Sequence, residues 1–308
     1  MTSDRTPDNY DLAALREQLL GNTDGEINES IPQLAEADPG LFGIATVTGD
    51  GAVRASGDSR VRFSVQSVVK PFVYGLALMD DRERVIAAVG TEPTGEAFDA
   101  VVLESDTGRP PNPLVNAGAL LTASLVNGAD PAERSARILA GLSAIAGVDL
   151  EVDEEVAQSE ELHGDRNRAL GYLMRSAGTL PVSVDDAIEV YARACAVLVD
   201  AETLAMMGAT LAYGGRNPRT GRQVLDRDIV TEVLSVMATC GMYDGSGRWL
   251  RRVGLPAKSG VSGGLVASAP GRLGLAVYSP PLDSEGNSVR GVLACEQLAD
   301  DLGLHVFA

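Results

Sequence analysis

The sequence predicts an α/β (α+β) protein in which both ends of the chain form one sheet domain and a helical domain is inserted between them. Three observations lead to this fold class. Apolar and polar residues alternate around a GDG turn near residue 50, as in a β-hairpin. Apolar residues recur at i, i+3 and i+4 through the middle of the chain, as on one face of a helix. Extended patterns return after Pro256.

The first half of the chain begins with the hairpin and continues with helices. LFGIATVTGDGAVRASGD (41–58) has the alternation of two strands joined by a tight turn. The segments that have helical spacing are 67–90, 131–148, 167–178 and 184–215.

Helix boundaries can be read from a few small and polar residues. Gly178 and the pair Gly214 and Gly215 are suitable helix ends because glycine adopts the left-handed conformation found there. Ser183 or Asp185 is a suitable helix start, since both side chains can accept a hydrogen bond from the first turn.

The last part of the chain predicts two strands within 265–282 and a closing helix within 286–302. We therefore expect a discontinuous sheet-plus-helix domain formed by residues 1–75 and 222–308. Residues 76–221 form the helical domain in this division, and the active site is expected between the two.

Composition and charge narrow the classes of partner. The formal net charge of −18 repels phosphate backbones and anionic lipid surfaces, so we expect no nucleic acid or membrane partner and a small-molecule substrate instead. Adaptation to high salt or selection for solubility would explain the same charge. No run of about 18 apolar residues occurs, and the N-terminus MTSDRTPDNY is polar, so we expect a cytoplasmic protein.

Cysteine and histidine are too few for a disulfide framework or a recognisable metal motif. The three cysteines, Cys195, Cys240 and Cys295, are odd in number and widely spaced, which favours buried thiols. His163 and His305 are the only histidines, and neither H-E-x-x-H nor C-x-x-C spacing occurs. We therefore expect no metal and no cofactor.

Lysine occurs only twice among the 25 Lys and Arg residues, at Lys70 and Lys258. In FSVQSVVKPF, Ser67 and Lys70 are three residues apart, so on a helix their side chains share one face. Apolar neighbours would desolvate the amine and make it a base, which arginine cannot be. Pro71 lacks only an early helical amide, so we expect Ser67 to cap the helix. Codon bias is the alternative explanation for the scarcity of lysine.

The two lysine segments together resemble a known superfamily. Ser-x-x-Lys near the N-terminus and Lys-Ser-Gly near the C-terminus (258–260) are the pattern of the serine β-lactamases and penicillin-binding proteins, although no clear S-D-N element falls between them. The glycine-rich VSGG that follows allows backbone amides to approach a ligand closely.

The intervening motifs resemble a narrower family, the serine-dependent glutaminases of the compact bacterial type. These motifs occur in family order from about residue 26 to 300: TEPTGEAFDA (91–100), RPPNPLVNAGAL (109–120), SEELHGDRNRALGYLMRSAG (159–178), TLAYGGRNPRTG (210–221), CGMYDGSG (240–247), VGLPAKSGVSGG (253–264) and YSPPLDSEGNSVRG (278–291). The resemblance implies a β-lactamase/transpeptidase-like fold, an antiparallel sheet flanked by helices with an inserted all-helical domain. It also implies a homo-oligomer, either a tetramer or a dimer.

The resemblance further implies hydrolysis of the L-glutamine side-chain amide to L-glutamate and ammonia. Ser67 would be the nucleophile, Lys70 its base and Tyr243 a proton relay to the leaving ammonia, with a γ-glutamyl ester on Ser67 as the intermediate. The backbone amides of Ser67 and Val261 would stabilise the oxyanion. The residues implied for substrate binding are Gln66, Ser67, Asn116, Glu160, Asn167, Tyr191, Tyr243 and Val261, with Lys258, Ser259 and Gly260 in support.

One position departs from the family pattern. Where the family commonly has Tyr before Ile-Pro, this chain has Ser30 in NESIPQLAEADPGLFG. That Tyr is expected to close over the substrate, so the contacts on this side of the pocket should differ. Another tyrosine, such as Tyr10, is a candidate replacement.

Other activities also fit parts of the sequence. Gly260 to Gly264 matches G-x-S-x-G around Ser262, and Asp283 and His305 follow in the order of an α/β-hydrolase triad. That fold needs a strand before the serine, a helix after it and more strands than 46 residues can supply. The superfamily resemblance also allows a β-lactamase or D,D-peptidase-like acyl-serine enzyme, or a ligand-binding module without turnover.

Overall fold

The structure, a computed structural model, describes residues 6–95 and 102–308. Its main sheet has five antiparallel strands in the order β2-β1-β7-β6-β5. The strands of this sheet are β1 (Gly43–Val47), β2 (Val53–Gly57), β5 (Ala257–Ser259), β6 (Gly264–Ala269) and β7 (Leu273–Tyr278). Because β1 pairs with β7, the two ends of the chain share one sheet, as the sequence predicts.

The predicted hairpin at 41–58 is confirmed, since β1 pairs antiparallel with β2 from Gly43 opposite Gly57 to Val47 opposite Val53. The predicted strands and closing helix of the C-terminal part are also present as β6, β7 and α12 (Val289–Leu302). Residues 96–100 of the TEPTGEAFDA motif lie outside the described residues.

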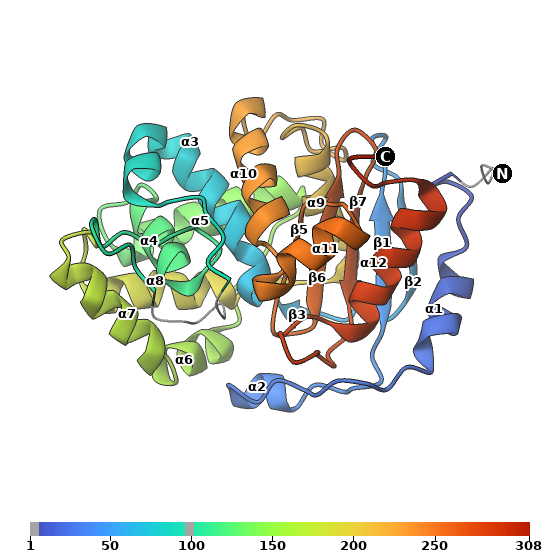
Figure 1. Ribbon diagram of the computed structural model, residues 1–308, viewed down its shortest axis with the longest axis horizontal. Helices are drawn as coiled ribbons and strands as arrows, with labels where there is room; N and C mark the ends of the chain where they lie inside the picture. Colours follow the sequence, from blue (N-terminus) through green and yellow to red (C-terminus); the bar gives the residue numbers. More distant parts are fainter. Residues whose placement is uncertain (1–5, 96–101) are drawn as a thin grey trace.

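Helices surround the sheet and fill the other half of the molecule. They are α1 (Leu12–Leu20), α2 (Pro32–Ala35), α3 (Lys70–Ala88), α4 (Asn116–Leu125), α5 (Pro131–Ala146), α6 (Glu154–Leu162), α7 (Asp165–Ser176), α8 (Val184–Cys195), α9 (Ala201–Ala212), α10 (Arg227–Cys240), α11 (Ser246–Arg252) and α12. Figure 1 shows α4, α5, α7 and α8 grouped beside the sheet, with α3 at the boundary. α9 packs on β1, β6 and β7, and α12 packs on β6 and β7.

Both faces of the sheet are buried at β1, β5, β6 and β7, so successive residues of these strands enter different apolar clusters. On β6, Val266 belongs to the cluster that includes α9 and the helical half, whereas Leu265 belongs to the cluster that includes α12. Gly274 on β7 permits the close approach of α9, because a Cβ there would lie 2.1 Å from the Ala209 amide nitrogen.

The middle of the chain differs from prediction in one element. The segment 184–215 is not continuously helical, because β4 (Leu198–Val199) separates α8 from α9 and pairs with β3 (Phe63–Ser64). α9 lies within the stretch assigned to the helical domain, yet it packs on the sheet. The division at 75/76 and 221/222 stays a prediction.

Local signals determine several helix ends. The Ser183 side chain accepts a hydrogen bond from the Asp186 amide and caps α8, so Ser183 rather than Asp185 is the start. Gly178 and Gly214 have positive φ angles of 76° and 64° just after α7 and α9. Within the described residues, no helix is both long and apolar enough to span a bilayer.

Candidate active site

The candidate nucleophile lies in a tight turn at the start of α3. Gln66–Val69 forms a 3₁₀ turn, and the Lys70 amide donates a hydrogen bond to the Ser67 carbonyl. The prediction that Ser67 caps the helix is wrong, because α3 begins at Lys70 and Val69 occupies the N-cap. A 3₁₀ turn has three residues per turn, so it superimposes the side chains of Ser67 and Lys70 more closely than an α-helix would.

Lys70 is almost completely buried, with 1% of its surface exposed. Its Nζ donates to the Asn116 Oδ1 at 2.7 Å and to the Leu114 carbonyl at 3.3 Å. A neutral amine has two N–H groups and one lone pair. When these two acceptors use the N–H groups, the lone pair is the part of the amine that can take a proton.

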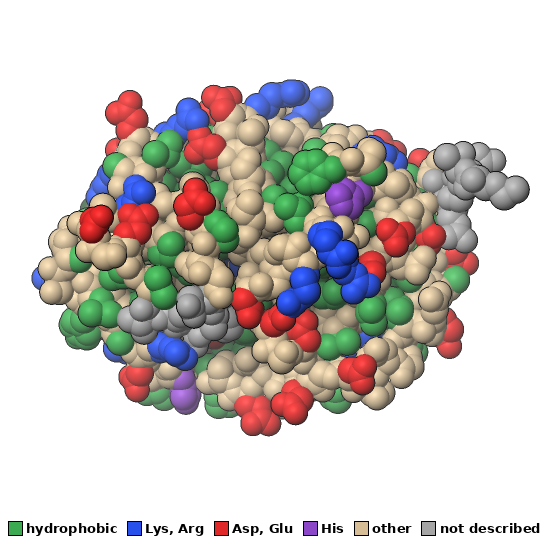
Figure 2. Space-filling view, in the orientation of Figure 1, with side chains coloured by type: hydrophobic (Ala, Val, Ile, Leu, Met, Phe, Trp, Pro, Cys, Tyr) green, Lys and Arg blue, Asp and Glu red, His purple; other side chains and the backbone are tan. Residues whose placement is uncertain are grey.

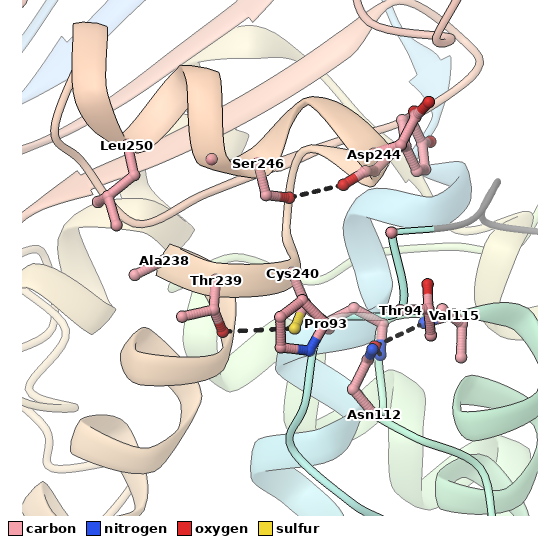
Figure 3. Close-up of a pocket in the computed structure, with 14 residues that line it drawn as sticks. Pro93, Thr94, Asn112, Val115, Ala238, Thr239, Cys240, Asp244, Ser246 and Leu250 are labelled. Atoms are coloured by element: carbon pink, nitrogen blue, oxygen red, sulfur yellow. Dashed lines mark hydrogen bonds between the residues drawn. The ribbon is translucent and has the colours of Figure 1, made fainter. Parts of the chain in front are cut away.

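The turn that carries the Leu114 carbonyl is held by a residue that the sequence analysis missed. Asn112 Oδ1 accepts hydrogen bonds from the amides of Leu114 and Val115, and its Nδ2 donates to the Glu92 carbonyl. Figure 3 shows Asn112 and Val115 at the wall of a cavity of about 440 Å³. An Asn that follows two prolines is a common turn signal, so its position in RPPNPL could have indicated this role.

Tyr243 is hydrogen-bonded to the candidate nucleophile, Ser67. Burial raises the pKa of the Tyr243 phenol, while a hydrogen bond with the Ser67 side chain acts in the opposite direction. The Tyr243 hydroxyl also donates to the Ser259 carbonyl at 3.1 Å. The phenol therefore joins Ser67 to the strand β5.

Backbone strain is concentrated beside Ser67. Gln66 and Tyr243 have φ angles of 49° and 53°, and in the described part of the chain they are the non-glycine residues with positive φ. Such conformations cost about 1 to 3 kcal/mol and cluster at functional sites. The strained Gln66 turns its side chain toward Glu160, where Nε2 donates to Oε1 at 2.9 Å.

A cavity of about 180 Å³ lies next to Ser67 and is called the substrate cavity here, because residues expected to bind substrate line it. It brings together seven of the predicted residues: Gln66, Ser67, Asn116, Glu160, Asn167, Tyr191 and Val261. Tyr243 lines the neighbouring cavity in Figure 3 instead. The other residues on the wall of the substrate cavity are Asn28, Ser30, Ile31, His163, Gly164, Arg166 and Cys195.

The polar groups of the cavity form a connected set. Asn116 Nδ2 donates to Asn167 Oδ1 at 3.0 Å, and the same Asn116 accepts from Lys70. Burial raises the pKa of the Glu160 carboxyl, against the hydrogen bond from Gln66 and the attraction of His163 and Lys70. Glu160 is thus a desolvated carboxylate, which favours binding of a cation.

Cys195 is a second residue that the sequence analysis missed in the cavity. It lies one helical turn after Tyr191 on α8, and its side chain is hydrogen-bonded to the buried Tyr191 hydroxyl. Burial raises the pKa of Cys195 to about 12, so the group stays a thiol at neutral pH. The four-residue spacing on a predicted helix was the available signal. The prediction that all three cysteines are buried thiols is confirmed.

Lys258 supports Tyr243 and does not line the substrate cavity. Its Nζ donates to the Ser259 carbonyl at 2.6 Å and lies 4.0 Å from the centre of the Tyr243 ring. Burial lowers the pKa of Lys258 well below its usual value, and repulsion from Lys70 adds to this. Gly260 continues the strand into the turn that presents Val261, and its amide donates to the Gly264 carbonyl.

Neither Ser262, the alternative nucleophile, nor Tyr10, the candidate replacement for the family tyrosine, has the position that its suggested role requires. Ser262 lies in the turn between the antiparallel strands β5 and β6, so the strand–turn–helix of an α/β-hydrolase elbow does not form there. Tyr10 cannot replace the family tyrosine at Ser30, because it packs in the α1–α12 cluster and its hydroxyl donates to Asp301 at 2.7 Å. Within the described ranges, no group of three or more His, Cys, Asp or Glu side chains is placed to hold a metal ion.

Comparisons with known proteins agree with this fold. The family model described as Glutaminase matches residues 25–307. A curated glutaminase from Clavibacter michiganensis subsp. michiganensis is 64% identical over 96% of this chain and 91% of the relative.

Solved structures are similar over nearly the whole chain. The structure of Mglu in its glutamate form is 46% identical with a TM-score of 0.92, covering 96% of this chain and 68% of that one. The structure described as probable glutaminase ybaS is 42% identical with a TM-score of 0.92 and covers 96% of each chain. These matches confirm the predicted β-lactamase-like fold class, and the chain belongs to the glutaminase family.

Proposed function

We propose that this glutaminase-family protein hydrolyses the side-chain amide of L-glutamine to L-glutamate and ammonia through a γ-glutamyl ester of Ser67. The observation that carries the proposal is that the nucleophile and residues proposed to bind the substrate line the same cavity. Ser67 lies there beside the buried amine of Lys70, together with the half-buried carboxylate of Glu160 and the amide side chains of Asn116 and Asn167. One of the similar solved structures is described as a glutamate form, and glutamate is the product of this reaction.

Acylation begins when Ser67 Oγ attacks the γ-carbon of glutamine. Lys70 takes the serine proton, because the Asn116 and Leu114 acceptors hold its two N–H groups and orient the lone pair. The backbone amides of Ser67 and Val261 stabilise the oxyanion, consistent with the presence of both residues on the cavity wall.

The other end of the cavity binds the α-ammonium and α-carboxylate groups of glutamine. The Glu160 carboxylate pairs with the substrate α-ammonium, which compensates the desolvation that raises the pKa of this group. Asn116, Asn167 and Tyr191 supply N–H and O–H donors for the α-carboxylate.

Departure of ammonia requires a proton at the amide nitrogen. The proton that Lys70 received is delivered there, and Tyr243 acts as relay because its phenol oxygen is hydrogen-bonded to Ser67. Water then cleaves the ester and regenerates Ser67. Lys258 holds the Tyr243 ring and the Ser259 carbonyl in place.

Ammonia release from L-glutamine, measured beside L-asparagine and D-glutamine, tests the proposed reaction. Ser67→Ala should abolish release while Ser262→Ala retains most of it, since Ser262 lies in the β-turn. The reverse result would reassign the nucleophile. Labelling of Ser67 by a fluorescent penicillin without glutamine hydrolysis would favour a penicillin-binding activity, and glutamine binding without ammonia release would favour a binding module.

We also propose a cytoplasmic homo-oligomer, a dimer or tetramer, that does not bind nucleic acid. The net charge of −18 supports the last part of this proposal, because like charge repels a phosphate backbone. Light scattering of the purified protein measures the oligomeric state, and a monomer at all concentrations would contradict it.

A further inference from the structure

A second groove opens directly from the substrate cavity. It has a volume of about 880 Å³ and shares Asn28 and Val261 with the cavity that contains Ser67. Ser30, on the wall of the substrate cavity, is small and exposed, and its hydroxyl donates to the Oδ1 of Asn28, one of the two shared residues, at 2.5 Å. The other residues of the groove are Asp24, Gly25, Glu26, Ile27, Asp244, Leu282, Asp283, Ser284, Glu285, Gly286 and Val289.

The groove begins at the end of the cavity where the scissile bond lies in the proposed reaction. Val261 is the proposed oxyanion donor, and Asp244 follows Tyr243, which is hydrogen-bonded to Ser67. The residues proposed to hold the α-ammonium and α-carboxylate groups, Glu160 and Tyr191 among them, line only the substrate cavity. A substituent on the leaving nitrogen would therefore extend into the groove.

The groove is strongly acidic. Asp24, Glu26, Asp244, Asp283 and Glu285 line it, and none of its lining residues in the described part of the chain is Lys, Arg or His. The neighbouring Arg248 pairs with Glu285 and neutralises one of these charges. Figure 2 shows acidic side chains close together in the middle of this face, below a group of basic ones.

We propose that this groove receives the leaving amine of N-substituted γ-glutamyl amides and prefers an amine that carries a positive charge. The inference rests on the proposed glutaminase reaction and extends its substrate class. Attack by Ser67 Oγ breaks the bond between the γ-carbon and nitrogen. The serine proton passes through Lys70 to that nitrogen, and the amine leaves through the groove. Water then cleaves the γ-glutamyl ester to give glutamate.

Three γ-glutamyl amides of similar shape and different charge test the preference. The leaving amines are 2-(trimethylammonio)ethylamine, its neutral isostere 3,3-dimethylbutylamine, and the anionic 2-aminoethanesulfonate. Glutamate release gives kcat/KM for each, with L-glutamine measured in parallel. We expect the cationic amide to exceed the neutral one by about fivefold at low salt, as for one exposed ion pair, and the anionic amide to be poorest. The preference should nearly vanish at about 1 M salt, where the screening length is about 3 Å.

Two double variants, each of which removes two carboxylates, show whether the groove causes the preference for a cationic amine. Asp24→Asn combined with Glu26→Gln removes two groove carboxylates and should lower the cationic-to-neutral ratio at least twofold without changing glutamine hydrolysis. Glu83→Gln combined with Asp300→Asn removes two exposed carboxylates outside the groove and should leave the ratio unchanged. Equal loss in both pairs would assign the preference to the net charge and overturn the proposal.

The glutamine control separates this proposal from the one on which it rests. If glutamine is hydrolysed and none of the three amides is cleaved, the groove does not receive a leaving amine. If all three amides are cleaved at equal rates, the proposed preference for a positively charged amine is overturned. If glutamine itself is not hydrolysed, the proposed glutaminase reaction fails instead.

Discussion

Replacing Asn116 by Asp is a sharp test of Lys70 as the base. The change keeps the size of the side chain and places a full negative charge 2.7 Å from Lys70 Nζ. With an effective dielectric constant of about 20, this charge stabilises the ammonium form by about 6 kcal/mol. Since about 1.4 kcal/mol corresponds to a factor of ten, the fraction of neutral amine at pH 7 falls by up to about 10⁴-fold.

The assay is ammonia release from glutamine as a function of pH. Asn116→Asp should be nearly inactive at neutral pH and should recover activity as the pH rises, because hydroxide removes the retained proton. Asn116→Ala is the control, since it removes the contacts with Lys70 and Asn167 without adding charge. Its rate should fall with little change in the shape of the pH profile. An Asn116→Asp variant with parental activity at pH 7, or with the pH profile of Asn116→Ala, would refute the role of Lys70 as base.

Three further changes test the remaining groups. Glu160→Gln should raise KM and remove the contribution of Glu160 to the acidic limb of kcat/KM, leaving the contribution of Lys70. Because burial raises the pKa of Glu160, folding stability is lost as the pH rises through that raised value. Thermal unfolding at neutral pH without ligand should therefore show Glu160→Gln to be more stable than the parent, and a less stable variant would contradict this. Cys195→Ala should raise KM about fivefold, the value of one hydrogen bond, with kcat within twofold. Cys195→Ser should restore KM, because a serine hydroxyl can keep the hydrogen bond with Tyr191; equal effects of both changes would make Cys195 a packing residue only. Lys70→Arg should be inactive although its charge is kept, and a rate near the parental one would show that Lys70 acts only by charge.

Signals that depend on a few neighbouring residues were reliable in this sequence. The GDG turn predicted the β1–β2 hairpin, and Ser183 predicted the start of α8, because each needs only local hydrogen bonds. The shared sheet was predictable because extended patterns occur at both ends of the chain. The strand β4 was not, since its apolar AVLV run also fits a helix and only its pairing with Phe63 and Ser64 decides.

The candidate site was likewise predictable only in part from the sequence. Most of its residues came from the family motifs, and the structure gathers them in one cavity. The 3₁₀ turn was not visible because S-x-x-K spacing is compatible with both helix types. Tyr10 was a wrong substitute for the missing tyrosine, because proximity to Ser30 in sequence does not fix the direction in which α1 packs.

The pairing of β1 with β7 has a consequence for synthesis of the chain. Gly43 and Tyr278 are partners, so nearly the whole polypeptide must leave the ribosome before β1 gains its second neighbour in the sheet. All five β1 residues are buried in the folded protein. Until β7 arrives, the nascent chain exposes an apolar strand edge that invites pairing with other chains. Premature termination between Gly57 and Leu273 should therefore yield an insoluble fragment rather than a slow enzyme.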